Sequence, residues 1–139
     1  MPRPVPRRKT LFTVPEAPDA PPALLCGHCE CGHVFFPAQR LGCERCGAHG
    51  DRIRIVEVPA RGALQAFATA YRPRPPEGEA PMVVGTVVLD AGPAFEVTLT
   101  AREEELCVGQ RVHGVLVESG RDEEGNTVFD CRFAPDGPA

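Results

Sequence analysis

The chain has 139 residues, of which 42% are hydrophobic and 24% are charged, and its formal net charge is −4 at pH 7. This length fits one domain of average size or two very small ones, and the composition is that of a globular protein. No apolar run approaches the roughly 20 residues that cross a bilayer. The basic, proline-broken start also lacks the apolar region of a secretory signal. We therefore expect a soluble, cytoplasmic protein that does not bind membranes.

The composition also disfavours nucleic acid as a ligand. Aromatic residues make up only 6% of the chain, and there is no tryptophan. Four basic residues precede the first acidic residue, Glu16, and from there on 11 basic residues stand against 19 acidic ones. Nucleic-acid binders usually carry a basic domain or stripe, because neutralisation of phosphates supplies much of their affinity. The excess of acidic residues from Glu16 onward therefore predicts partners other than nucleic acid.

Residues 1–23 are the first of three predicted parts. The segment up to Pro22 holds 7 of the 16 prolines. Proline lacks the N–H donor and clashes with the preceding helical turn, so a long helix is excluded here. We expect an extended arm, with the apolar stretch 11–14 docked on a neighbouring surface.

Residues 24–52 contain five of the seven cysteines. In a chain without a secretion signal, clustered Cys-x2-Cys pairs indicate metal ligands rather than disulfides. Cys43 and Cys46 have this spacing and are followed by Gly47, which permits the tight turn in which backbone amides point at the sulfurs. The segment therefore predicts a small zinc ribbon.

The first half of the ligand set is less regular. Cys26 and Cys29 have the usual spacing but no glycine after them, whereas Cys31 is followed by Gly32 but has His28 three residues before it. Four protein ligands leave no position for water or substrate, so we expect a structural zinc ion rather than a catalytic one. Cys26 or His28 is the alternative ligand from the first half. The predicted ligands are Cys29, Cys31, Cys43 and Cys46.

Residues 53–139 form the third predicted part, a series of short alternating or β-branched segments separated by turn signals. Such a pattern over about 80 residues favours a five-stranded OB-type barrel over a sandwich. Residues 102–106 predict no more than one helical turn. The predicted fold is mainly β, a zinc ribbon followed by a five-stranded OB-type β-barrel. The expected strands are Ile53–Val58, Ala63–Tyr71, Met82–Leu89, Phe95–Thr100, Arg111–Glu118 and Val128–Phe133.

We find no convincing catalytic group in the sequence. Cys107 and Cys131 lie among apolar residues, where cysteine behaves as a small core side chain. A nucleophilic cysteine needs a base and an electropositive surrounding, and neither is evident. His113, beside Gly114, is more typical of a packed or surface histidine. The sequence predicts no catalytic residue.

Several stretches resemble one known family. They are Cys31–Pro37 followed by Cys43–Gly47, and, in the third part, residues 61–64, 81–90, 104–112 and 128–135. Over roughly residues 24–135 the chain resembles the acyl-CoA-associated OB-fold proteins, which carry a rubredoxin-like zinc ribbon ahead of the barrel.

This resemblance implies an accessory subunit without catalytic residues, such as the small subunit of benzoylsuccinyl-CoA thiolase. Members of the family are similar to partners of thiolase-fold enzymes, which they stabilise as hetero-oligomers. It also implies a coenzyme A thioester as the ligand of the complex. Arginines suit its phosphates, and the candidates are Arg40, Arg45, Arg72 and Arg74. Exposed aromatic rings mark interfaces, and the candidates for contact with the partner are Phe12, Phe35 and Phe36.

Two other functions stay open from the sequence. OB barrels can bind single-stranded nucleic acid through aromatic residues and a basic groove, so a nucleic-acid-binding module is one alternative. A stand-alone acyl-CoA thioesterase is the other. In that case Cys107 or His113 would carry the reaction.

Overall fold

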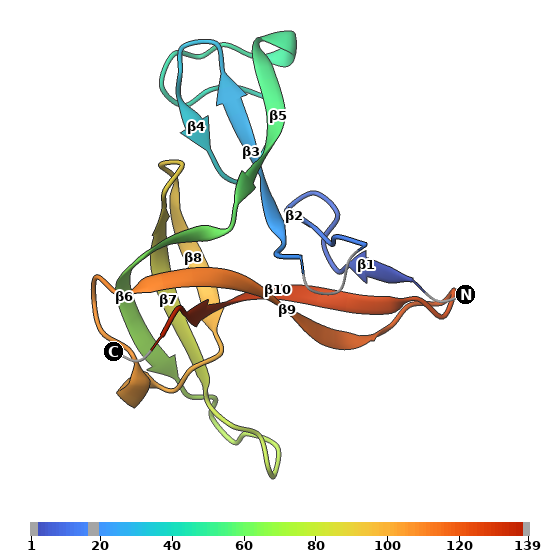
Figure 1. The fold of residues 1–139 in the computed structure, drawn as a ribbon, viewed down its shortest axis with the longest axis vertical. Helices are drawn as coiled ribbons and strands as arrows, with labels where there is room; N and C mark the ends of the chain where they lie inside the picture. The colour runs from blue at the N-terminus through green and yellow to red at the C-terminus, as the bar shows by residue number, and fades with distance from the viewer. Residues whose placement is uncertain (1–2, 17–19, 138–139) are drawn as a thin grey trace.

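The computed structural model describes residues 3–16 and 20–137, which form two β-sheets (Figure 1). Residues 1, 2 and 17–19 of the predicted arm lie outside the described residues. Within the described part, no helix is long and apolar enough to cross a membrane. The elements are, in chain order, β1 Pro4–Pro6, β2 Phe12–Thr13, β3 Ala23–Cys29, β4 Val34–Phe35, η1 Gly50–Arg52, β5 Ile53–Pro59, β6 Arg61–Ala70, β7 Met82–Leu89, β8 Ala94–Leu99, η2 Glu103–Glu105, β9 Arg111–Arg121 and β10 Thr127–Pro135.

The larger sheet closes into a barrel of strands β6 to β10. Antiparallel ladders join β6 to β7, β7 to β8, β9 to β10 and β6 to β9, and one parallel contact between β10 and β8 closes the ring. Along β7 every second side chain is buried, as expected for a strand with one face toward a core. The prediction of a mainly β chain with a five-stranded OB-type barrel is confirmed.

The smaller sheet, which we call the ribbon sheet, consists of β2, β3, β4 and β5. It stands above the barrel in Figure 1. β5 pairs with β3 along its whole length, from Ala23 opposite Pro59 to Cys29 opposite Ile53. The predicted boundary at residue 53 placed this strand with the barrel, whereas in the structure it pairs with β3. A strand is recognisable from its own residues, but the sheet that it joins depends on pairing with residues far away in the chain.

The arm is extended and lies against both sheets. β1 pairs in parallel with the first residues of β10, and β2 pairs with β3. Phe12 is only 3% exposed and packs in the same core as Leu24 and Val58. The apolar stretch of the arm is therefore covered by this chain itself.

Gly62 in β6 passes so close to β7 that a side chain does not fit. A Cβ atom at this position would overlap the backbone carbonyl group of Val88, which cannot move without breaking the ladder between the two strands. We expect Gly62→Ala to lower the free energy of unfolding by about 2 kcal/mol or more. Gly42→Ala is the control, because nothing lies within 4 Å of its Cβ position. Urea unfolding followed by circular dichroism measures both, and equal midpoints would contradict the close contact.

Asp90, after β7, and Arg111, at the start of β9, form an ion pair with two hydrogen bonds of 2.8 and 2.6 Å. The hydrogen bonds from Arg111 lower the pKa of the Asp90 carboxyl. A carboxyl whose pKa is lower in the folded state stabilises the fold above its unfolded pKa of about 3.9, and this contribution disappears as the pH falls through the lowered value. We expect Asp90→Asn to melt at a lower temperature than the unmodified chain at pH 7. The two melting temperatures should become equal once the pH is below the lowered pKa of Asp90. A constant difference across the pH range would contradict the ion pair's role.

Candidate metal centre

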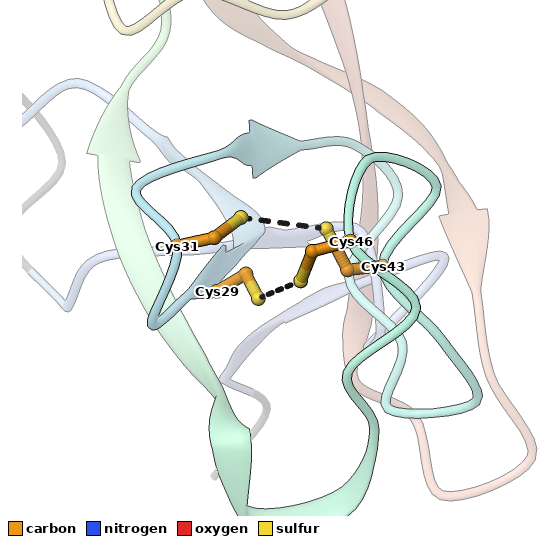
Figure 2. A group of neighbouring side chains, drawn as sticks. All are labelled: Cys29, Cys31, Cys43 and Cys46. Atoms are coloured by element: carbon orange, nitrogen blue, oxygen red, sulfur yellow. Dashed lines mark hydrogen bonds between the residues drawn. The ribbon is translucent and has the colours of Figure 1, made fainter.

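The first two thiols of the site come from the turn between β3 and β4. Cys29 ends β3, and its N–H donates to the His33 carbonyl at 2.9 Å, while the Gly32 N–H donates back to the Cys29 carbonyl at 2.9 Å. Gly32 has a φ of 95°, which a residue with a side chain adopts only under strain. The turn brings Cys29 and Cys31 to the same side of the hairpin (Figure 2).

The other two thiols come from a second turn of the same kind. The Gly47 N–H donates to the Cys43 carbonyl at 2.8 Å, and Gly47 has a φ of 79°. The Cys43 N–H donates to the Ala48 carbonyl at 2.8 Å. Before this turn, the Gln39 side chain accepts the N–H groups of residues 41 and 42 and fixes the approach of the chain. The glycine after each pair therefore has a conformational role.

The four thiols converge on one point (Figure 2). The Sγ atoms of Cys29 and Cys46 are 3.5 Å apart, those of Cys31 and Cys43 are 3.8 Å apart, and all four sulfurs lie within 4.8 Å of one another. A tetrahedral zinc ion with Zn–S bonds of about 2.3 Å needs sulfurs roughly 3.8 Å apart. Four thiolates are also the donor set of closed structural zinc sites. The residues present thus fit zinc, and they leave no coordination position for a substrate.

The surroundings of the Cys43 thiol favour its thiolate form. Burial raises the pKa of the Cys43 thiol, but hydrogen bonds from the backbone N–H groups of Cys46 and Arg45 and from neighbouring thiols outweigh it and bring the pKa to about 6. At Cys29 the backbone N–H of Cys31 lowers the pKa, while burial and the adjacent thiols raise it, to about 12 overall. Cys43 therefore loses its proton more readily than Cys29, and a metal ion that binds both must displace the proton of Cys29.

The two alternative ligands of the first half lie elsewhere. Successive side chains of a strand point to opposite faces, so Cys26 and His28 lie on the face of β3 opposite to Cys29. Cys26 is fully buried in the core that the ribbon sheet shares with the barrel, and burial raises its pKa to about 11. Cys26 therefore acts as an apolar core residue. The regular spacing of Cys26 and Cys29 falls within a strand, where it cannot form a metal-binding turn.

A contact that the sequence did not reveal links the two turns. The His33 Nε2 atom lies 2.8 Å from the Glu44 Oε1 atom, across the gap between the first and second pair of cysteines. Under the thiols, Phe35, Ala48 and Ile53 form a small apolar core together with Cys29 and Cys43. Sequence spacing identifies the ligands but not this link, because His33 and Glu44 are 11 residues apart.

The aromatic residues predicted for a partner interface are mostly covered within the chain. Phe12 and Phe35 are 3% and 7% exposed, respectively, so neither offers a free surface, and this part of the prediction is corrected. Small units have few apolar residues, and these two fill the unit's own cores. Phe36 is partly exposed and packs against Phe95, with ring centroids 4.5 Å apart. It lies at the junction of the ribbon sheet with the barrel.

The four predicted arginines do not form one cluster. Arg40 and Arg45 are on the ribbon sheet side, whereas Arg72 and Arg74 are in the loop between β6 and β7, at the opposite end of the molecule (Figure 1). Arg40 donates to the Ile53 carbonyl at 3.1 Å, and Arg72 pairs with Glu79 at 2.8 Å. The four candidate arginines therefore belong to two separate parts of the chain, because the β6–β7 hairpin carries two of them away from the ribbon sheet.

The two residues considered for thioester hydrolysis are not joined. Cys107 is exposed, and its N–H donates to the Gln110 side chain. The His113 Nδ1 atom lies 2.6 Å from the Asp136 carboxylate. In the described part of the chain, no hydrogen bond connects Cys107 with His113, and a nucleophile needs such contact with its base.

Comparisons with known proteins agree with the fold. Residues 55–117 match the family described as ChsH2, C-terminal OB-fold domain. Among solved structures, the chain is similar to one titled "Ltp2-ChsH2(DUF35) aldolase", with a TM-score of 0.63, 25% identity, and coverage of 83% of this chain and 86% of that chain. No curated protein sequence matches the chain significantly. The chain thus carries a ChsH2-type OB-fold segment over residues 55–117, and over most of its length it shares the fold of a chain from the Ltp2–ChsH2 aldolase structure.

Proposed function

We propose that this chain is a non-catalytic, zinc-binding accessory subunit of a thiolase-type enzyme complex that acts on acyl-CoA. The observation that carries the proposal is the similarity over 83% of the chain to a structure whose title names ChsH2 together with a second protein, Ltp2. In this proposal the subunit stabilises the thiolase-fold partner and helps to shape the entrance for the acyl-CoA.

The chemistry of the described residues supports an accessory role. The four clustered thiols occupy every position of a tetrahedral metal, so the metal's part is to hold the two turns together. When bound, zinc would balance two of the four thiolate charges and leave no open coordination site. Zn²⁺ is therefore the proposed structural cofactor, held by Cys29, Cys31, Cys43 and Cys46.

The proposal is tested by co-purification. We expect the tagged, zinc-loaded chain to recover a thiolase-fold protein in near-stoichiometric amount from its native extract, as identified by mass spectrometry and weighed by light scattering. The tag alone is the control. Recovery of nucleic acid in place of a protein would favour a nucleic-acid-binding module. Thioester hydrolysis by the isolated chain would favour a stand-alone acyl-CoA thioesterase.

Coenzyme A is proposed as a ligand of the complex. Two of the candidate arginines lie between β4 and η1 and two between β6 and β7, so we expect this chain alone to hold coenzyme A weakly. Titration calorimetry with an acyl-CoA should therefore give clear binding to the assembled complex and weak or no binding to the isolated chain. Equal affinity for both would place the binding site on this subunit.

A further inference from the structure

The barrel is closed on one side by a single contact, which leaves a gap between β8 and β10. β8 pairs with β7 from Ala94 to Leu99, but it meets β10 only where Leu99 lies opposite Phe133. The Thr100 N–H donates to the Phe133 carbonyl at 2.9 Å, and from this point the two strands diverge. Before this bridge, the outer edge of β8 at Ala94 and Glu96 has no backbone partner among the described residues.

The backbone groups that face this gap follow from strand alternation. The Pro93 carbonyl accepts the Leu89 N–H on the β7 side, whereas Thr100 donates on the opposite side. Because the N–H and C=O of one residue in an antiparallel strand point the same way and successive residues alternate, those of Glu96 and Thr98 point into the gap. The Glu96 N–H and C=O and the Thr98 N–H are free at this strand edge among the described residues, whereas the Thr98 C=O belongs to the parallel bridge between Leu99 and Phe133.

β10 forms the facing wall over a short length. β1 covers β10 up to Phe129, whose carbonyl accepts the Arg7 N–H at 2.8 Å. Two residues after Phe129, the backbone of Cys131 points the same way, and its carbonyl has no backbone partner in the described ranges. The gap therefore has exposed strand edges on both sides.

The gap opens onto a groove of about 320 Å³ that is lined by both apolar and polar side chains. Phe36, Phe95 and Val97 line it, together with the Cys131 thiol. Burial raises the pKa of Cys131 to about 12, so the thiol is neutral and behaves as an apolar group. This part of the groove thus suits an uncharged side chain.

The rim of the groove on the arm side is positively charged. The side chains of Arg7 and Arg8 line this rim, and Arg7 is 59% exposed, while the carboxylates of Glu96 and Asp130 line other parts of the groove. Arg7 is no closer than 4.0 Å to Asp130, so this pair is weak. Guanidinium groups in such a position complement a carboxylate.

We propose that the groove between β8 and β10 binds an extended peptide segment of a partner subunit. The segment adds as a strand to the free edge of β8, places an apolar side chain against Phe36 and Phe95, and sets an acidic group beside Arg7 and Arg8. Strand addition of this kind gains affinity from backbone hydrogen bonds and specificity from alternate side chains. It also covers a strand edge that would otherwise promote aggregation. The inference goes beyond the proposed function and does not depend on which enzyme the partner is.

The test selects ligands from a phage-displayed library of random peptides on the immobilised, zinc-loaded full chain. We expect selected peptides to show alternating apolar residues and an acidic residue. Their synthetic forms should bind about tenfold more weakly to Thr98→Pro, which removes the outward N–H. Thr98→Val keeps this N–H and is the matched control. A proline is tolerated at an edge position whose N–H faces away from the ladder, and circular dichroism checks that both variants fold.

A second pair of variants tests the rim independently of the strand edge. Replacing Arg7 and Arg8 together by glutamate should weaken binding of the acidic peptides about tenfold, whereas Lys9→Glu, outside the groove, should not. Selection without any pattern, or equal affinity for Thr98→Pro and Thr98→Val, would overturn the proposal. Dimerisation of the chain that Thr98→Pro abolishes would also overturn it, since a second copy would then occupy the groove.

Discussion

Replacing Cys43 by serine should reduce the zinc content from about one ion per chain to almost none and unfold the ribbon sheet. The Cys43 thiol is buried and sits between the two turns, 3.8 Å from Cys31. A neutral hydroxyl is a poor ligand for zinc, and the small apolar core beneath the thiols is too small to hold the two turns without the metal. Binding of structural zinc contributes about 10–16 kcal/mol to the folding of such small units, so the effect is large.

Cys26→Ser is the matched control, because it removes a buried thiol of β3 that does not belong to the cluster. Elemental analysis of purified variants should show zinc retained in Cys26→Ser and lost in Cys31→Ser and Cys43→Ser. Circular dichroism should show loss of strand signal only in the latter two. Zinc retained in Cys31→Ser, or lost in Cys26→Ser with the barrel intact, would refute the ligand set.

The strands of the barrel were predictable because their signals are local. Alternating β-branched residues bounded by glycine and proline turns mark each strand from β6 to β10, and residues 102–106 contain a single helical turn, η2, as expected. What the pattern could not show is which sheet β5 joins. Its outcome depends on pairing with β3, which lies up to 36 residues away in the chain.

The cysteines show the same division between local and distant information. Spacing and the following glycines indicated both turns, but the choice among Cys26, His28 and Cys29 required knowing where β3 ends. Once β3 runs to Cys29, Cys26 points to the opposite face and Cys31 falls in the turn. The covering of Phe12 by the chain itself was likewise hidden, since it depends on how the arm pairs with β3.

Phe133→Ala should lower the free energy of unfolding by about 3–5 kcal/mol, the usual cost of removing a buried phenylalanine ring. Phe133 is 1% exposed, its ring meets Phe95 edge-on at 6.0 Å, and Phe95 in turn contacts Phe36 at 4.5 Å. Its backbone carbonyl also makes the contact that closes the barrel through Thr100. The ring therefore supports the barrel core and the junction with the ribbon sheet together.

Tyr71→Ala is the matched control, because this ring is 76% exposed at the end of β6 and its removal should change the stability by less than about 0.5 kcal/mol. Urea unfolding of zinc-loaded chains, followed by circular dichroism because there is no tryptophan, measures both variants. If Phe133→Ala unfolds at the same urea concentration as Tyr71→Ala, the ring does not hold the core. If the barrel loosens while zinc stays bound, the ribbon sheet's stability comes from the metal and the barrel's from this aromatic cluster, so the two sheets depend on separate sources of stability.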